Sequence, residues 1–300
     1  MTERFFAASR VLVVAGKGGV GKTTVGAAIG VAAAGAGLNV LLVELDGRSG
    51  IGRPFARDEL GYVEQELERT RSGGRIRGRR ITPDDALADY LAASGLRRFT
   101  DRLTPGAVDV VAATAPGLRD LLALGKIRQL EQAAAADLIV VDAPASGHAI
   151  SFLRAPAGLA AASSSGPIRR QAELALAMLG DADRCQVMLV TRPEEAPVTE
   201  TVETAYSLEE HVGVKLGPVV VNGCWPELAG LEAAAARPGA NPTAVAAAEY
   251  RLARGRRQAH EIERLGEELP LPQISLPFRF TAHLTRRDLD VLAGALGTLR

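Results

Sequence analysis

A glycine- and lysine-rich motif, Gly16–Thr23 (GKGGVGKT), directly follows the apolar run Val11–Ala15 and opens an alanine-rich stretch that predicts a helix. A strand, a glycine-rich loop and a helix in this order form a phosphate-binding loop, because backbone N–H groups of the loop converge on phosphate oxygens at the positive end of the helix. Lys22 is then expected to reach the β- and γ-phosphates, and the Thr23 hydroxyl to bind Mg²⁺. The alternative is a glycine-rich turn without a ligand, although two of the only four lysines lie in this motif.

Short apolar runs alternate with helix-length stretches rich in Ala, Leu and Glu along the chain. The runs that predict buried strands are Val11–Ala15, Val40–Glu44, Val108–Ala113, Leu138–Asp142, Val187–Thr191, Val219–Asn222 and Gln273–Leu276. Uninterrupted Val, Leu and Ile strands separated by helices predict an α/β fold with a mainly parallel, doubly wound sheet covered on both faces. In such sheets ligands bind at the carboxyl ends of the strands.

Charge and cysteine content narrow the classes of function. The chain has 35 basic and 35 acidic residues and a pI near 6.9, so it has no overall field for nucleic acid or an anionic membrane, and no nucleic-acid partner is expected. Two cysteines cannot build a disulfide framework and no signal peptide is recognisable, so a cytoplasmic location is expected. No charge occurs from Thr23 to Val43, but Gly35–Asn39 breaks this stretch into a helix and a short strand, which argues against a membrane span.

Residues 54–107 differ in composition from the rest of a chain that we otherwise expect to form a single domain over residues 1–300. This segment is predicted to be a helical insertion beside the sheet, with Pro83–Ala93 as a helix that Thr82 caps. Five arginines and three glycines lie in Arg71–Arg80. That pattern favours a solvated loop, with a site for an acidic partner as the alternative.

The extended motif Lys17–Thr24 (KGGVGKTT) resembles the deviant phosphate loop of the dimeric ATPases related to MinD, ParA, nitrogenase reductase and the arsenite-pump ATPase ArsA. In that family the early lysine contacts the nucleotide of the facing subunit. The resemblance therefore implies a P-loop NTPase fold of the SIMIBI type and a dimer in which Lys17 acts across the interface. The alternative for Lys17 is an exposed loop lysine.

The segment Asp142–His148 (DAPASGH) follows a predicted strand and resembles the second switch (DTAPTGH) of ArsA and of the related ATPase that delivers tail-anchored proteins. The resemblance implies that Asp142 holds Mg²⁺ through water, that Gly147 lets the loop move, and that His148 is a switch residue. A structural role at the start of a helix is the alternative for His148.

Three residues in the C-terminal half of the chain resemble the family's base-binding positions. Asn222 ends an apolar run where the family has an asparagine that recognises adenine, and Pro277-Phe278 falls where the family places a loop beside the base. Asn222 lacks the following Lys and Asp of the guanine-specific pattern, which favours ATP over GTP. A turn-capping role for Asn222 and a core position for Phe278 stay open. The expected nucleotide-binding residues are Gly16, Lys17, Gly18, Gly19, Val20, Gly21, Lys22, Thr23, Thr24, Asn222, Pro277 and Phe278.

The first switch departs from the family pattern. Where the family has Asp-Pro-Ala-His-Ser, this chain has Asp46-Gly47-Arg48-Ser49 after Glu44-Leu45. Asp46 is expected to position the attacking water, with loop capping as the alternative. Cys185 and Cys224 are too few and too far apart for a zinc clamp, an arsenite triad or an iron–sulfur site. Within this family, the chain resembles the single-domain actinobacterial ArsA-like proteins, which resemble a paired set encoded together.

The leading hypothesis is a dimeric, Mg-ATP-dependent switch ATPase in which Lys17, Lys22 and Asp46 are catalytic. Its cofactors are ATP and Mg²⁺, and its partners a second copy or a paralogous ArsA-like ATPase and an unidentified client protein. The alternative is a catalytically weak subunit that regulates such a paralogue. A third hypothesis is a ParA- or MinD-like positioning protein with peripheral membrane association through the leucine-rich tail Leu284–Leu299, although packing of that tail on the sheet explains its pattern better.

Overall fold

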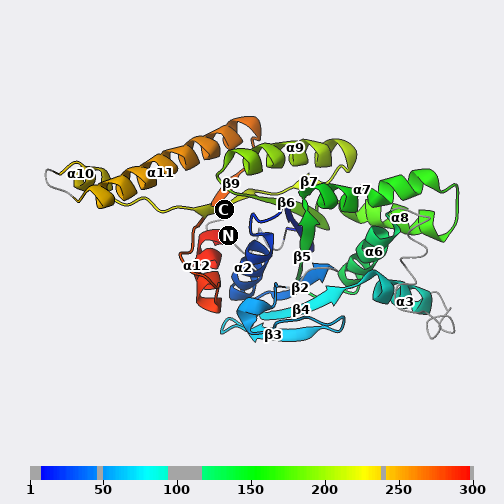
Figure 1. The fold of residues 1–300 in the computed structure, drawn as a ribbon. Helices are drawn as coiled ribbons and strands as arrows, with labels where there is room; N and C mark the ends of the chain where they lie inside the picture. Colours follow the sequence, from blue (N-terminus) through cyan, green and yellow to red (C-terminus); the bar gives the residue numbers. More distant parts are fainter. Residues whose placement is uncertain (1–7, 46–49, 94–116, 238–240, 298–300) are drawn as a thin grey trace.

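The computed structural model describes residues 8–45, 50–93, 117–237 and 241–297, and its strands form one sheet (Figure 1). The strands are β1 (Val11–Gly16), β2 (Asn39–Leu45), β3 (Gln65–Arg69), β4 (Arg75–Ile81), β5 (Leu138–Ala145), β6 (Cys185–Thr191), β7 (Lys215–Leu216), β8 (Val219–Cys224) and β9 (Gln273–Pro277). Their order is β3-β4-β2-β5-β1-β6-β8-β9, with β7 beside β6. All described pairs are parallel except β3–β4. The predicted α/β fold with a mainly parallel sheet is confirmed.

Helices cover both faces of this sheet (Figure 1). The helical elements that the structure describes are α2 (Lys22–Gly35), the 3₁₀ turn η1 (Arg53–Phe55), α3 (Pro83–Ala93), α6 (Leu118–Gln132), α7 (Ser146–Ala162), α8 (Pro167–Leu179), α9 (Glu195–His211), α10 (Leu231–Ala235), α11 (Pro242–Glu268) and α12 (Arg286–Leu296). Alternate residues of β1 enter two separate cores, because successive side chains of a strand point to opposite faces. Val11 and Val13 pack with α6–α9, whereas Leu12 and Val14 pack with α2 and α12.

Six of the predicted apolar strands are found in the structure, within β1, β2, β5, β6, β8 and β9. The seventh, Val108–Ala113, lies outside the described residues. The predicted packing of the C-terminal tail is also confirmed for its described part, because Leu289, Leu292 and Leu296 of α12 are buried against α2. These leucines form the inward face of α12, whereas Val291 of the same helix is exposed.

The prediction of a helical insertion over residues 54–107 is wrong for its central part. Residues 65–81 form the hairpin β3–β4, and β4 pairs with β2 as a strand of the main sheet, whereas α3 is helical as predicted. The hydropathy pattern of the sequence does not indicate a strand here, because β4 is rich in arginine. Arg77 is paired with Glu64, and the buried Arg79 stacks on Tyr62 with its guanidinium carbon 4.6 Å from the ring centre. The predicted solvated loop at Arg71–Arg80 is therefore largely a strand.

The connection between β8 and β9 carries α10 and α11, which project away from the sheet (Figure 1). Of the 27 residues of α11, only Ala248, Gln258 and Leu265 are buried. The base of α11 contacts α9, which follows β6 directly. The long helix is thus attached to the body close to the carboxyl ends of the strands.

Candidate nucleotide-binding site

The predicted phosphate loop connects the buried strand β1 to α2 at the carboxyl edge of the sheet. Two of its glycines are required by their surroundings. Gly16 has φ 148°, and a Cβ there would lie 2.2 Å from the Val190 carbonyl oxygen. Gly21 has φ 95°, and its Cβ would lie 2.3 Å from Nδ2 of Asn222. The backbone can pass between neighbouring strands and present its N–H groups only because these positions have no side chain.

Lys22 is the first residue of α2, and only 4% of it is exposed. Its Nζ donates a hydrogen bond to the Lys17 carbonyl oxygen at 2.9 Å, so the ammonium lies across the loop that its own backbone forms. A buried ammonium at a helix N-terminus adds a full charge to the partial charge of the helix. This combination suits an anionic ligand with several oxygens.

Thr23 and Asp142 meet at the end of the neighbouring strands β1 and β5. The Thr23 hydroxyl donates to Oδ2 of Asp142 at 2.6 Å, and Asp142 is 1% exposed. Val14 is the register partner of Asp142, so the carboxylate is fixed by the sheet itself. A hydroxyl and a carboxylate side by side form the type of oxygen donor set that Mg²⁺ prefers, with water and phosphate oxygens completing the shell.

Glu44 is a further site residue, which the sequence interpretation did not assign. It is the register partner of Asp142 on β2, it is 1% exposed, and its Oε1 accepts from the backbone N–H groups of Gly50 (2.6 Å) and Ile51 (2.8 Å). These two hydrogen bonds hold the backbone at Gly50. Gly50 lies beside Thr23, since a Cβ built on Gly50 would be 3.6 Å from the Thr23 methyl carbon. Glu44 could have been identified from the sequence as an acidic residue at the end of an otherwise apolar strand.

We expect Glu44→Ala to lower the free energy of unfolding by about 2–4 kcal/mol, because two backbone N–H groups lose their acceptor. Glu44→Gln keeps an oxygen acceptor and should cost about 1 kcal/mol. Urea unfolding of both variants measures the difference. Equal losses in the two variants would contradict the role given to this oxygen.

The phosphate loop opens into a cleft of about 780 Å³ whose walls include most of the predicted nucleotide-binding residues. Those on its walls are Gly19, Val20, Gly21, Thr23, Thr24, Asn222, Pro277 and Phe278. Nδ2 of Asn222 donates to the Val20 carbonyl oxygen at 2.8 Å, so Asn222 also supports the loop. Phe278 packs 5.8 Å from the ring centre of Trp225, the only tryptophan of the chain. Base binding by Asn222, Pro277 and Phe278 stays a prediction.

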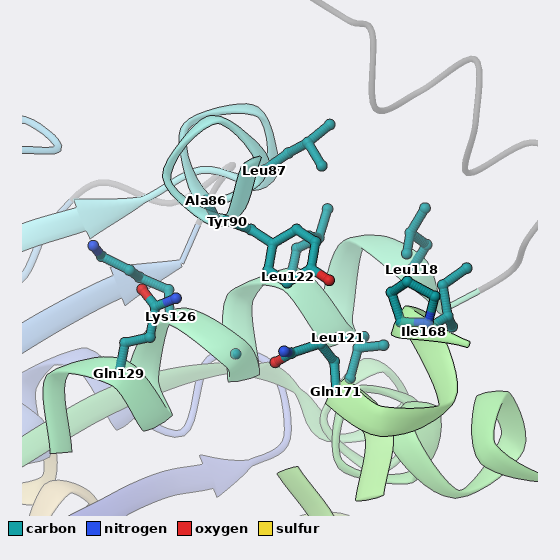
Figure 2. A pocket seen from close by; sticks show the side chains of 12 residues that line it. Ala86, Leu87, Tyr90, Leu118, Leu121, Leu122, Lys126, Gln129, Ile168 and Gln171 are labelled. Atoms are coloured by element: carbon teal, nitrogen blue, oxygen red, sulfur yellow. The ribbon is translucent and has the colours of Figure 1, made fainter. Parts of the chain in front are cut away.

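A second cavity, of about 220 Å³, lies between α3, α6 and α8 (Figure 2). Its walls are mostly apolar, from residues such as Leu87, Leu121 and Ile168. Two of its polar groups already have partners within the chain: Lys126 is ion-paired with Asp89, and the side-chain oxygen Oε1 of Gln171 accepts from Arg128 at 3.2 Å. The cleft at the phosphate loop is therefore the better site for a phosphate-bearing ligand.

Comparison with known proteins agrees with this geometry. The sequence profile of the family described as "Anion-transporting ATPase" (ArsA ATPase) matches residues 9–164, which include β1, the phosphate loop and β5. This chain belongs to the ArsA ATPase family. It is 34% identical to "ATPase BagA" of Mycobacterium tuberculosis over 227 residues, which cover 71% of this chain and 64% of that protein. It is 30% identical to an "Arsenical pump-driving ATPase" of Escherichia coli over 241 residues, which cover 72% of this chain and 39% of the relative. The chain thus spans less than two thirds of the length of these relatives.

This ArsA-family member shows no group of three or more His, Cys, Asp or Glu side chains suited to a metal within its described residues. Cys185 is buried, and burial raises the pKa of its thiol to about 12. Burial also raises the pKa of the half-buried Cys224. Among the helices that the structure describes, none is long and apolar enough to cross a bilayer.

Other predicted residues of this ArsA-family chain lie apart from the cleft or outside the described part. Asp46, the predicted water-positioning residue, falls in residues 46–49, which the structure does not describe. Gly147 and the exposed His148 lie in the first turn of α7. Lys17 is ion-paired with Glu200 of its own chain, and Gly18 is exposed at the tip of the loop.

Arginines also reach the cleft of this ArsA-family chain, which the sequence did not indicate: Arg53, Arg192 and Arg279 line its walls. Arg279 donates to Asp288 at 3.0 Å, and Asp288 forms a capping box with Thr285 at the start of α12. Hydrogen bonds from the backbone N–H and the hydroxyl of Thr285, together with Arg279, hold the pKa of Asp288 below its usual range. The Asp288 carboxylate therefore binds Arg279 at the cleft wall and also caps the start of α12.

Because its folded-state pKa is lowered, Asp288 stabilises the fold above its unfolded pKa of about 3.9, and this contribution is lost as the pH falls through the folded value. We expect Asp288→Asn to cost about 1 kcal/mol at neutral pH, the usual worth of a helix cap. The difference from the unaltered chain should shrink below about pH 4. Urea unfolding of both chains between pH 7 and pH 3 measures it, and a difference that does not change with pH would contradict the assignment.

Proposed function

We propose that this chain is a Mg²⁺-dependent ATPase that changes conformation with the state of its nucleotide and acts as a dimer. The observation that carries the proposal is the buried Lys22 at the start of α2, next to the Thr23–Asp142 pair and beside a cleft whose walls include Thr23, Asn222 and Phe278. Family membership supports ATP as the ligand, because the matched relatives carry ATPase names.

Each residue has a part that follows from its chemistry. The loop N–H groups and the Lys22 ammonium bind phosphate oxygens, and the charge at Lys22 stabilises the negative charge that builds up on the leaving phosphate. Thr23 and Asp142 would hold Mg²⁺, and the charge of the bound ion would offset that of the phosphates. Asp46 orients the attacking water, and Lys17 supplies a second cation to the nucleotide of the facing subunit. Glu44 positions Gly50 at the edge of the site.

Binding can be measured directly, because the single Trp225 touches Phe278 at the wall of the cleft. We expect ATP with Mg²⁺ to change the fluorescence of Trp225 in a saturable way, and GTP to bind at least about tenfold more weakly. Phe278→Ala should reduce the change while leaving the phosphate loop intact. Equal responses to ATP and GTP would contradict base recognition at Asn222, and no response to either with the loop intact would contradict a nucleotide site here.

A second candidate function is a nucleotide-binding subunit with weak activity that regulates a paralogous ATPase in a heterodimer. The altered sequence after Asp46, in which Gly47 and Arg48 stand where the family has Pro and Ala, favours this alternative. It differs from the first proposal in one respect: turnover appears only when the second chain is added. The client whose binding the nucleotide state controls is in both cases a further protein.

A further inference from the structure

The phosphate loop is tied to α9 by an ion pair between Lys17 and Glu200. The two residues are 183 positions apart in the sequence, and their side chains are 35% and 36% exposed. Both side chains are partly exposed to solvent. An anion that approaches the loop can therefore compete with Glu200 for the Lys17 ammonium.

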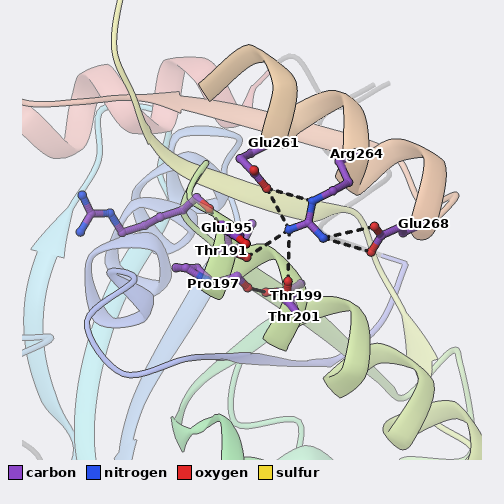
Figure 3. Close-up of polar contacts among 9 residues, drawn as sticks. Thr191, Glu195, Pro197, Thr199, Thr201, Glu261, Arg264 and Glu268 are labelled. Atoms are coloured by element: carbon purple, nitrogen blue, oxygen red, sulfur yellow. Dashed lines mark hydrogen bonds and ion pairs between the residues drawn. The ribbon is translucent and has the colours of Figure 1, made fainter. Parts of the chain in front are cut away.

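Glu200 stands on a well-fixed part of α9. The Thr201 hydroxyl donates to the Pro197 carbonyl at 2.8 Å, and the Thr204 hydroxyl donates to the carbonyl of Glu200 itself at 2.6 Å. Arg264 of α11 donates to the Glu195 carbonyl at 3.1 Å and to the Thr199 hydroxyl at 3.2 Å (Figure 3).

The same Arg264 is held in turn by Glu261 at 2.8 Å and Glu268 at 3.2 Å, both on α11 (Figure 3). The start of α9 is therefore braced by α11 on the side of Arg264. Because the start of α9 is held in place, Glu200 determines the position of the Lys17 ammonium, and the ammonium does not determine the position of Glu200.

Both lysines of the loop are engaged within their own chain. Lys22 donates to the carbonyl of Lys17, and the side chain of Lys17 turns to Glu200. Lys17 is not among the residues on the walls of the nucleotide cleft. An ammonium that is held at α9 by a carboxylate is not available to a phosphate on another molecule.

We propose that Glu200 is the positioning residue for Lys17: it holds the ammonium within its own chain, and Lys17 reaches the nucleotide of a second subunit only when this ion pair opens. The inference rests on the proposed function, in which Lys17 acts across a dimer. Removing the carboxylate charge then makes Lys17 available more often and raises turnover, provided that nucleotide binding within the chain is unchanged.

Availability of Lys17 can be tested without any activity, by the rate at which an amine-acetylating reagent modifies it. Only three other lysines compete, and the exposed Lys215 serves as the internal standard in mass spectra of the same sample. We expect Glu200→Gln to raise the labelling of Lys17 relative to Lys215 by about two- to fivefold, the range expected for losing a partly exposed pair. Glu203→Gln, an exposed acid on the same helix, is the matched control and should change nothing.

Turnover then tests the consequence. Glu200→Gln should lower the protein concentration needed for half-maximal turnover per chain by about two- to fivefold. Glu200→Asp, which keeps the charge, should behave more like the unaltered chain. In a Lys17→Ala background the effect of Glu200→Gln should vanish, whereas a merely structural effect of the substitution would persist.

Three results would overturn the inference. Unchanged labelling of Lys17 in Glu200→Gln means that the ion pair does not hold the ammonium. Faster labelling with lower turnover means that Glu200 holds Lys17 in its working position instead. Turnover that is absent in the unaltered chain at every concentration overturns the proposed function, and with it the catalytic part of this inference, while the labelling result still reports on the ion pair alone.

Discussion

Lys22→Ala should lower steady-state ATP turnover by at least about 100-fold, because the substitution removes a donor placed where negative charge develops on the phosphates. ATP affinity should fall by about 10- to 100-fold, which corresponds to the loss of one charged hydrogen bond. The effect follows from the burial of Lys22 at the start of α2, beside the loop. Turnover by a coupled phosphate assay and affinity from Trp225 fluorescence measure the two effects separately.

Lys215→Ala is the matched control for Lys22→Ala. Lys215 is exposed on the short strand β7, away from the cleft, and its loss should leave both turnover and ATP affinity unchanged. Circular dichroism of Lys22→Ala checks that the fold is retained. Near-normal turnover in a folded Lys22→Ala chain would refute the phosphate site.

Lys17→Ala should have an effect of similar size and different character. A cation supplied by a second molecule accelerates phosphoryl transfer by about 10³–10⁵ where arginine fingers do this, so we expect turnover to fall by about 1,000-fold. ATP affinity should change by less than about threefold, because the lysine does not bind the nucleotide of its own chain. A loss of affinity as large as the loss of turnover would show that Lys17 acts within its own subunit.

Mixing the two inactive variants tests the exchange of lysines between subunits. In a mixed dimer, the Lys17→Ala subunit binds ATP with its intact Lys22, and the Lys22→Ala subunit supplies Lys17. Random assortment makes half of the dimers mixed with one working site each, so about a quarter of the unaltered activity should return. A mixture as inactive as its components would contradict action across the interface.

Most of the fold could be predicted from the sequence because its central strands are buried on both faces and therefore appear as uninterrupted apolar runs. The strand β4 escaped this pattern. Arg77 is ion-paired with Glu64 and Arg79 stacks on Tyr62, and these contacts depend on the tertiary fold rather than on the hydropathy of the strand. Both β3 and the two-residue β7 are too polar or too short to give a periodic signal.

The strand–loop–helix arrangement around Gly16–Thr23 was predictable because its glycines serve local backbone geometry, which a short motif encodes. Glu44 was not assigned, because its role depends on the pairing of β2 with β5, which places it opposite Asp142, and on hydrogen bonds from the N–H groups of Gly50 and Ile51. The partner of Lys17 was likewise invisible, since Glu200 lies 183 residues away on another helix. Contacts of this kind are set by strand order, which apolar periodicity does not encode.

The most direct test of the account is the turnover of the purified chain alone, per chain, as its concentration is raised, with Asp46→Asn as the control. We expect turnover per chain to rise with protein concentration to a plateau, as a dimer forms, and to collapse in the variant. Tight ATP binding without turnover at any concentration would contradict a self-sufficient ATPase and would direct the search to a second, paralogous chain.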